Sequence, residues 1–138
     1  MWSTEHSAET KAAPEAVWRV WSDVERWPEW NPDLERAVLT GVFAAGSTIT
    51  MYQQGGDTIE LRIAEAREPE QFVDEADLGD VVVRTTHRLE PVGEGLVRVA
   101  YRMEITGPQA DTVGPQLGPQ ISADFPQVLA ALVEHAKR

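Results

Sequence analysis

Apolar and polar residues alternate along much of this chain, which is the pattern of half-buried β-strands. Turns that contain glycine or proline separate the alternating segments at fairly regular intervals. Together these signals predict strands at residues 2–10, 34–40, 48–53, 58–67, 71–78, 81–90 and 96–106. Neither a repeat nor a low-complexity linker interrupts the series, so we expect a single domain over residues 1–138.

A helical pattern follows the first strand. Pro14 suits the first turn of a helix, where its missing N–H would be unpaired in any case. Four apolar residues then recur at helical spacing: Val17, Trp18, Trp21 and Val24. Ser22 and Glu25 match a capping box, which predicts that a second short helix begins there. Trp27 and Trp30 follow in a proline-containing loop, where we expect them to rim a pocket or to fill one.

The C-terminal segment has a helical pattern as well. Its apolar residues at helical spacing are Leu117, Ile121, Phe125, Val128, Leu129, Leu132, Val133 and Ala136. Three prolines interrupt the first half, because each removes a backbone donor and crowds the preceding turn. We therefore expect a kinked lead-in and then a helix at about residues 124–137. This helix is predicted to bury Phe125, Leu129 and Leu132 and to leave Glu134 and Lys137 in solvent.

The order of elements (strand, two short helices, six strands, long helix) resembles the helix-grip fold. More narrowly, it resembles the polyketide cyclase/dehydrase and lipid-transport group of the START-like (Bet v 1-like, SRPBCC) superfamily. The resemblance covers essentially the whole chain and rests mainly on residues 12–18, residues 23–32, and Gly46-Ser47 before the third strand. It implies an α+β fold in which a seven-stranded curved antiparallel sheet grips the C-terminal helix across its concave face, with a cavity between them. Members are described as ligand carriers, aromatases and cyclases, hydrolases, and cofactor or partner binders.

Composition and charge narrow the classes of function. A chain of 138 residues buries roughly 68% of the surface that its unfolded form exposes, which leaves room for a cavity. It has no cysteine, so disulfides, thiolate zinc sites and cysteine nucleophiles are excluded. The net charge of −11 disfavours binding to nucleic acids and to anionic membranes. Neither a membrane-length apolar run nor a secretion-signal pattern is present, so we expect a cytoplasmic protein without stable membrane insertion.

The predicted turn at Gly79-Asp80 sets the pairing of the two strands around it. With Gly first in a two-residue turn, residue 78 pairs with residue 81. Counting back places Asp74 opposite Thr85 and residue 72 opposite His87, and a slip by one residue would bury acidic side chains instead. On the following strand, a longer turn is expected to hold His87 near residue 99 and Tyr101 opposite Thr85.

Asp74, Thr85, His87 and Tyr101 thus form a polar cluster on an otherwise apolar concave face. Diagonal neighbours on a sheet face lie about 7–8 Å apart at Cα, so Asp74 and His87 can exchange a hydrogen bond. A carboxylate beside an imidazole is an arrangement for general acid–base catalysis. It also satisfies two buried polar groups without any chemistry, and both interpretations stay open.

Other ionisable residues are weaker candidates. Glu65 and Arg67 face inward if the turn after them is tight, whereas a single β-bulge would turn both to solvent. His6 is expected on the inner face, but it lacks the close ligand spacing that a metal site shared with His87 would need, so we expect no metal. His135 lies near the C-terminal end of a helix, where the helix dipole favours a cation.

Two classes of function fit these residues best. The first is the binding or sequestration of a small hydrophobic or aromatic molecule, with Asp74 and His87 orienting a polar group. The residues expected to contact that ligand are Trp27, Trp30, Met51, Phe72, Thr85, Tyr101, Met103 and Phe125. The second is an enzyme of the cyclase or aromatase type, in which His87 and Asp74 would move protons during aldol closure and dehydration of a polyketone.

A third interpretation is a protein-interaction module like the Hsp90-activator relatives of this fold. It would need a sizeable exposed apolar patch, which the charged outer faces of the strands argue against. We favour the carrier over the enzyme, because the chain offers one acid–base pair and no residue pattern that demands turnover. No cofactor is expected, and the identity of any protein partner is left open.

Overall fold

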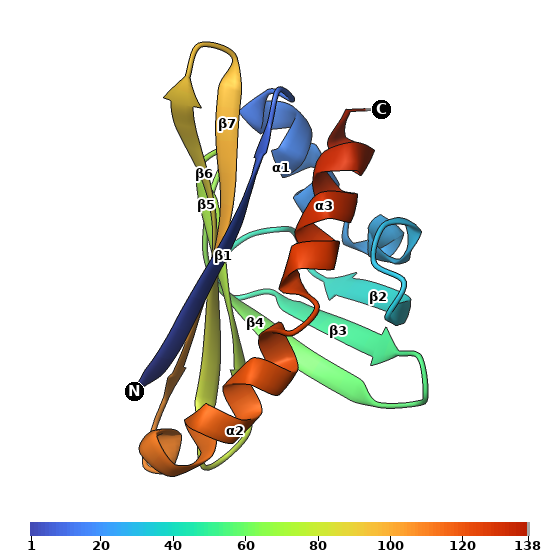
Figure 1. Cartoon of the computed structure of the whole chain (residues 1–138). Coiled ribbons are helices and arrows are strands. Elements are labelled where there is room, and N and C mark those ends of the chain that lie inside the picture. The colour runs from blue at the N-terminus through green and yellow to red at the C-terminus, as the bar shows by residue number, and fades with distance from the viewer. Residues whose placement is uncertain (138) are drawn as a thin grey trace.

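A curved antiparallel sheet forms the frame of the computed structural model, which describes residues 1–137 and leaves Arg138 outside (Figure 1). Its seven strands follow the order β1-β7-β6-β5-β4-β3-β2. They are β1 (Trp2–Thr10), β2 (Leu34–Thr40), β3 (Thr48–Gln53), β4 (Thr58–Arg67), β5 (Gln71–Asp77), β6 (Val82–Gly93) and β7 (Leu96–Thr106). The predicted sheet is confirmed, with most strand ends at the residues expected from the alternation.

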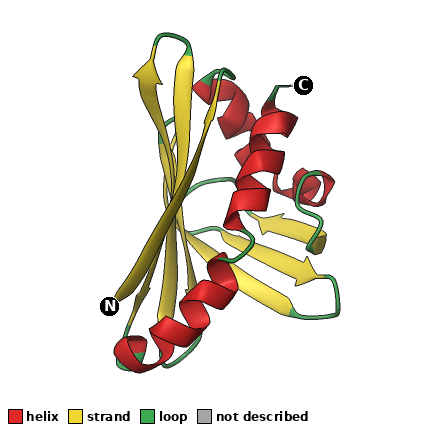
Figure 2. Ribbon diagram, in the orientation of Figure 1, coloured by secondary structure: helices red, strands yellow, loops and turns green. Residues whose placement is uncertain are grey.

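The helices all lie on one side of this sheet (Figure 2). They are α1 (Pro14–Ser22), the short 3₁₀ helix η1 (Val24–Glu29), α2 (Ala110–Ser122) and α3 (Phe125–Ala136). Figure 1 shows α3 in the angle between β1, β6 and β7 on one side and β2 and β3 on the other, with α2 continuing the helical layer toward the end of the sheet where β1 begins. The α+β helix-grip fold is thereby confirmed. Within residues 1–137, no helix is long and apolar enough to cross a membrane.

The alternation along β5 and β6 places side chains as predicted. The backbone N–H of Leu78 donates to the carbonyl of Val81, which closes the expected tight turn. Asp74 pairs with Thr85 in the sheet, and Phe72 pairs with His87. The inner face of β6 therefore carries His87, while charged residues lie on the outer face, where they form ion pairs.

The predicted register between β6 and β7 was wrong by two residues. Strand β6 continues through a β-bulge to Gly93, which pairs directly with Leu96, so the turn is shorter than expected. As a result His87 lies opposite Tyr101, and Thr85 lies opposite Met103. A shift by two keeps every side chain on its predicted face, because side chains alternate with a period of two.

The predicted capping box was also wrong. Ser22 is the last residue of α1, and its hydroxyl donates to the carbonyl of Arg19 at 3.3 Å instead of capping η1. The carboxylate of Glu25 accepts a hydrogen bond from the backbone N–H of Leu39 at 3.1 Å. Glu25 therefore ties η1 to β2 instead of closing back on the start of its own helix.

The C-terminal helical segment divides where the prolines predicted a kink. A break at residues 123–124 separates α2 from α3, and α2 is a regular helix despite two internal prolines. Leu129 and Leu132 are fully buried, as predicted. Phe125 is half-buried, contrary to expectation, because one side of its ring faces a cavity instead of the core.

Candidate functional site

A cavity of about 790 Å³ lies between the concave face of the sheet and the helical layer. Residues from α1, from η1 and the loop after it, from β2 to β7 and from both C-terminal helices line it. The residues predicted to contact a ligand that lie on its wall are Trp27, Trp30, Met51, Phe72, Thr85, Tyr101 and Phe125. Met103, which was also predicted, is fully buried in the core and does not belong to the wall. Exposed lining residues such as Gln54, Leu78 and Gln120 mark the opening.

Three tryptophans give one side of the cavity its shape. The indole N–H of Trp21 donates to the hydroxyl of Tyr101 at 3.1 Å, and that of Trp27 donates to the carbonyl of Trp21 at 3.0 Å. Trp30 packs beside Trp27 with ring centroids 6.2 Å apart, and its indole N–H has no partner among the described residues. These hydrogen bonds hold the aromatic wall in place, since each indole has one donor to satisfy.

His87 is held firmly on the cavity wall. Its ring stacks on Phe72 with centroids 3.9 Å apart, and its Nδ1 lies 3.2 Å from the carbonyl oxygen of Phe72. Burial lowers the pKa of His87 to about 3, although the bond to Phe72 opposes that change. We assign the proton of the neutral ring to Nδ1, which can donate to that carbonyl. The lone pair of Nε2 then faces the cavity side of the ring.

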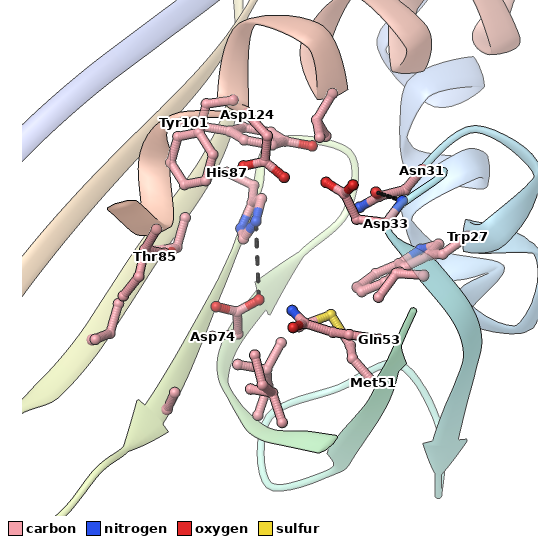
Figure 3. A pocket seen from close by; sticks show the side chains of 18 of the residues that line it. Trp27, Asn31, Asp33, Met51, Gln53, Asp74, Thr85, His87, Tyr101 and Asp124 are labelled. Carbon is pink, nitrogen blue, oxygen red and sulfur yellow. Dashed lines mark hydrogen bonds and ion pairs between the residues drawn. The ribbon is translucent and has the colours of Figure 1, made fainter. Parts of the chain in front are cut away.

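Asp74 lies on the neighbouring strand and points toward His87 (Figure 3). Its Oδ2 is 3.9 Å from Nε2 of His87, which is beyond hydrogen-bond distance. Burial, with a smaller contribution from the adjacent Glu75, raises the pKa of Asp74 to about 7. Because the imidazole is neutral, this pair is not a salt bridge. Near neutral pH the Asp74 carboxyl interconverts between its acid and its carboxylate form.

Sequence reasoning missed a pair of carboxyls at the opening. Asp33 precedes β2, Asp124 occupies the break between α2 and α3, and Figure 3 shows their side chains pointing toward one another. Burial and the neighbouring Asp33 raise the pKa of Asp124 to about 6. Trp21 was missed as well, since its spacing indicated only a core position. No local sequence pattern links Asp33 with Asp124, which lie far apart in the chain, so only the tertiary fold reveals this pair of carboxyls.

The weaker candidates lie away from the cavity or at its margin. A β-bulge between Ile63 and Glu65 turns Glu65 and Arg67 to the outer surface, where their side chains form an ion pair at 3.0 Å. His6 faces inward and packs edge-on against Phe125. Within the described part of the chain, no three His, Asp or Glu side chains are grouped closely enough to hold a metal ion.

A curved sheet closed by a C-terminal helix over an apolar cavity defines a START-like, Bet v 1-like protein. The chain belongs to the polyketide cyclase/dehydrase and lipid-transport family, whose model matches residues 1–137. No curated protein sequence matches it. Family membership and fold together support a ligand-binding or cyclase function.

Solved structures share the fold at low sequence identity. Norcoclaurine synthase from Thalictrum flavum superposes with a TM-score of 0.77 at 14% identity, over 96% of this chain and 84% of that chain. A START superfamily protein from Mycobacterium smegmatis gives 0.73 at 15% identity, over 98% and 97%. The di-domain aromatase/cyclase BexL gives 0.79 at 17% identity, and the match covers 99% of this chain but 47% of BexL.

Proposed function

We propose that this protein binds a small hydrophobic or aromatic molecule in the cavity and acts as a carrier or sequestering protein, with residues 1–138 as one ligand-binding domain. The observation that carries the proposal is the cavity of about 790 Å³ with its aromatic wall. Its volume falls within the range of about 300–1,000 Å³ that is typical of small-molecule sites. Such sites combine mostly apolar walls with a few polar groups that orient the ligand.

The polar groups divide the cavity into two parts. Trp27, Trp30 and Phe72 offer flat apolar surface for the body of the ligand. Asp74 and His87 lie together on the sheet side and have hydrogen-bonding capacity left over, because neither is bonded to the other. A hydroxyl group placed between them would satisfy both, because it can donate to Nε2 of His87 and accept from the protonated carboxyl of Asp74. A related fold holds molecules of this kind, since norcoclaurine synthase was solved with dopamine and hydroxybenzaldehyde.

Filling the cavity tests this proposal. N-phenylnaphthylamine is uncharged and fluoresces more strongly in apolar surroundings, so its emission should rise when it enters the cavity. Thr85→Trp adds an indole on the inner face of β6 and should abolish that rise. Thr86→Trp, one residue along on the outer face, is the matched control and should leave the rise unchanged. Equal titration curves for both variants and the wild type would show that the cavity is not the binding site.

A second candidate, the cyclase or aromatase function, rests on the acid–base pair. Asp74 has a pKa of about 7, which suits a group that must both take up and release a proton near neutral pH. The carboxylate would remove a proton from the carbon next to a ketone of the bound substrate. The resulting acid, or a proton donor beside it, would return a proton to the oxygen after ring closure.

Proton exchange separates the enzyme from the carrier. In deuterated buffer, an enzyme should speed the exchange of the methyl protons of an aryl methyl ketone, a reaction followed by NMR. Asp74→Asn should slow this exchange by roughly 10²–10⁴-fold while the ketone still binds. Exchange at the buffer rate with saturating protein would favour the carrier.

A protein-interaction role lacks support in the described residues. Their exposed large apolar side chains are Met1, Val42, Tyr52 and Leu78, which come from four separate parts of the chain. An interaction surface normally needs a contiguous patch of several hundred Å².

A further inference from the structure

Among the described residues that line the cavity, four are acidic and none is basic apart from His87. Asp33, Asp57, Asp74 and Asp124 lie on its wall, and none of the described lining residues is a lysine or an arginine. His87 could add a positive charge, but burial lowers its pKa to about 3 and keeps it neutral. An anionic ligand would therefore meet repulsion that no positively charged side chain among the described lining residues offsets.

The Asp74 carboxyl indicates independently that the cavity lacks a positively charged partner. It is only 5% exposed, its carboxyl points into the cavity in Figure 3, and it has no hydrogen-bond partner within residues 1–137. Buried carboxylates are normally paired with a cation or bonded to several donors, because desolvation of an unpaired charge is costly. Desolvation by burial, with a smaller contribution from the neighbouring Glu75, raises the pKa of Asp74 to about 7. A cation supplied by the ligand would complete the site.

The wall around Asp74 suits a cation as well as an apolar body. Trp27, Trp30 and Tyr101 present aromatic rings to the same space. The face of an aromatic ring attracts a positive charge, and it does so more strongly where water is excluded. Aromatic surface and a buried carboxylate together are the elements of an amine-binding site.

We propose that the ligand of this cavity carries a protonated amine on an aromatic body, that the amine binds the Asp74 carboxylate, and that acidic ligands are excluded. This inference rests on the proposed function, because it specifies the charge of the molecule that the cavity binds. Asp33 and Asp124 at the opening act in the same direction, since they attract a cation toward the entrance and repel an anion.

Three ligands of one shape test the charge preference. Naphthylmethylamine, naphthylmethanol and naphthoate share one ring system and differ in a positive, neutral or negative group. Their affinities are measured by displacement of N-phenylnaphthylamine at about pH 8, where Asp74 is largely ionised. The amine should bind roughly tenfold more tightly than the alcohol, since a charge-assisted hydrogen bond is about twice as strong as a neutral one. The carboxylate should bind roughly tenfold more weakly than the alcohol, because the Asp74 carboxylate repels it.

Two variants assign the preference to Asp74. Asp74→Asn should bring the ratio of amine to alcohol affinity down to about one. Glu60→Gln removes a charge from the exposed face of β4, away from the cavity, and should leave the ratio unchanged. If the probe binds but the wild type prefers the alcohol or the carboxylate, this inference is overturned and the proposed function stands. If the probe itself does not bind, the proposed function fails first.

Discussion

Burial favours the neutral form of both Asp74 and His87 in the folded protein, and the two groups change the stability with pH in opposite directions. Burial raises the pKa of the carboxyl from 3.8 to about 7, so the folded state keeps a proton that the unfolded chain releases. Burial lowers the pKa of the imidazole from 6.5 to about 3, so the folded state lacks a proton that the unfolded chain binds. Asp74 thus makes stability fall as pH rises from about 4 to 7, whereas His87 makes it rise from about 3 to 6.5.

Asp74→Asn removes the first of these slopes and leaves the second. The free energy of unfolding of the variant, relative to the wild type, should therefore rise with pH between about 4 and 7, by at most about 1.4 kcal/mol per pH unit. Urea unfolding at a series of pH values measures this difference.

Asp77→Asn is the control, because Asp77 is exposed at the end of the same strand and does not belong to the buried pair. A pH-independent difference between Asp74→Asn and the wild type would mean that Asp74 is already ionised in the folded state at low pH. The slope is the measured quantity, since a buried amide shifts the stability by the same amount at every pH.

The local part of the site could be predicted from the sequence, and its distant part could not. The Gly79-Asp80 turn fixed the pairing of Asp74 with Thr85, because a two-residue turn leaves little freedom of register. The partner of His87 on β7 was predicted as residue 99 and is Tyr101, since no sequence pattern around Pro91 predicts the β-bulge. Whether side chains fill the space between the sheet and the helices depends on side-chain volumes from many elements, and no single segment determines the outcome.

At the scale of elements, α2 depends on glycine to approach β1 closely. Added Cβ atoms at Gly114 and Gly118 would meet Trp2, the first at 2.7 Å from its Cβ and the second in overlap with its indole ring. Both glycines are buried on the side of α2 that faces the sheet. The absence of their side chains allows a helix with two internal prolines to pack against the strand.

Gly118→Ala should reverse the usual effect of this substitution. In most helices the change stabilises by roughly 0.5–1 kcal/mol. Here we expect a loss of roughly 1–3 kcal/mol, because the new methyl group overpacks against the indole of Trp2. Thermal or urea unfolding measures the change.

The same substitution in a Trp2→Ala background is the matched control. There Gly118→Ala should become neutral or stabilising, because the ring is gone. Gly114→Ala should stay destabilising in that background, since it meets the Cβ atom that alanine retains. If Trp2→Ala rescues neither or both, the packing of α2 on β1 differs from the structure described.

At the scale of the whole molecule, the arrangement of layers was predictable and the packing within them less so. Alternation and glycine-containing turns located the strands, and the proline positions located the break between α2 and α3. Phe125 shows where such reasoning fails: helical spacing indicates the side that faces the sheet, but it does not distinguish a filled core from a cavity wall.

The order of the strands also constrains how the chain folds. Strand β1 pairs along its whole length with β7, from Trp2 opposite Ile105 to Thr10 opposite Val97. During synthesis the strand has no sheet partner until β2 to β6 have been translated and β7 has followed them. Trp2, His6 and the other residues of β1 therefore have no neighbouring strand for most of translation. Pairings between segments this far apart in the chain form late and make folding slow. The polar residues that alternate along β1 help to prevent the unpaired strand from pairing with other chains during this time.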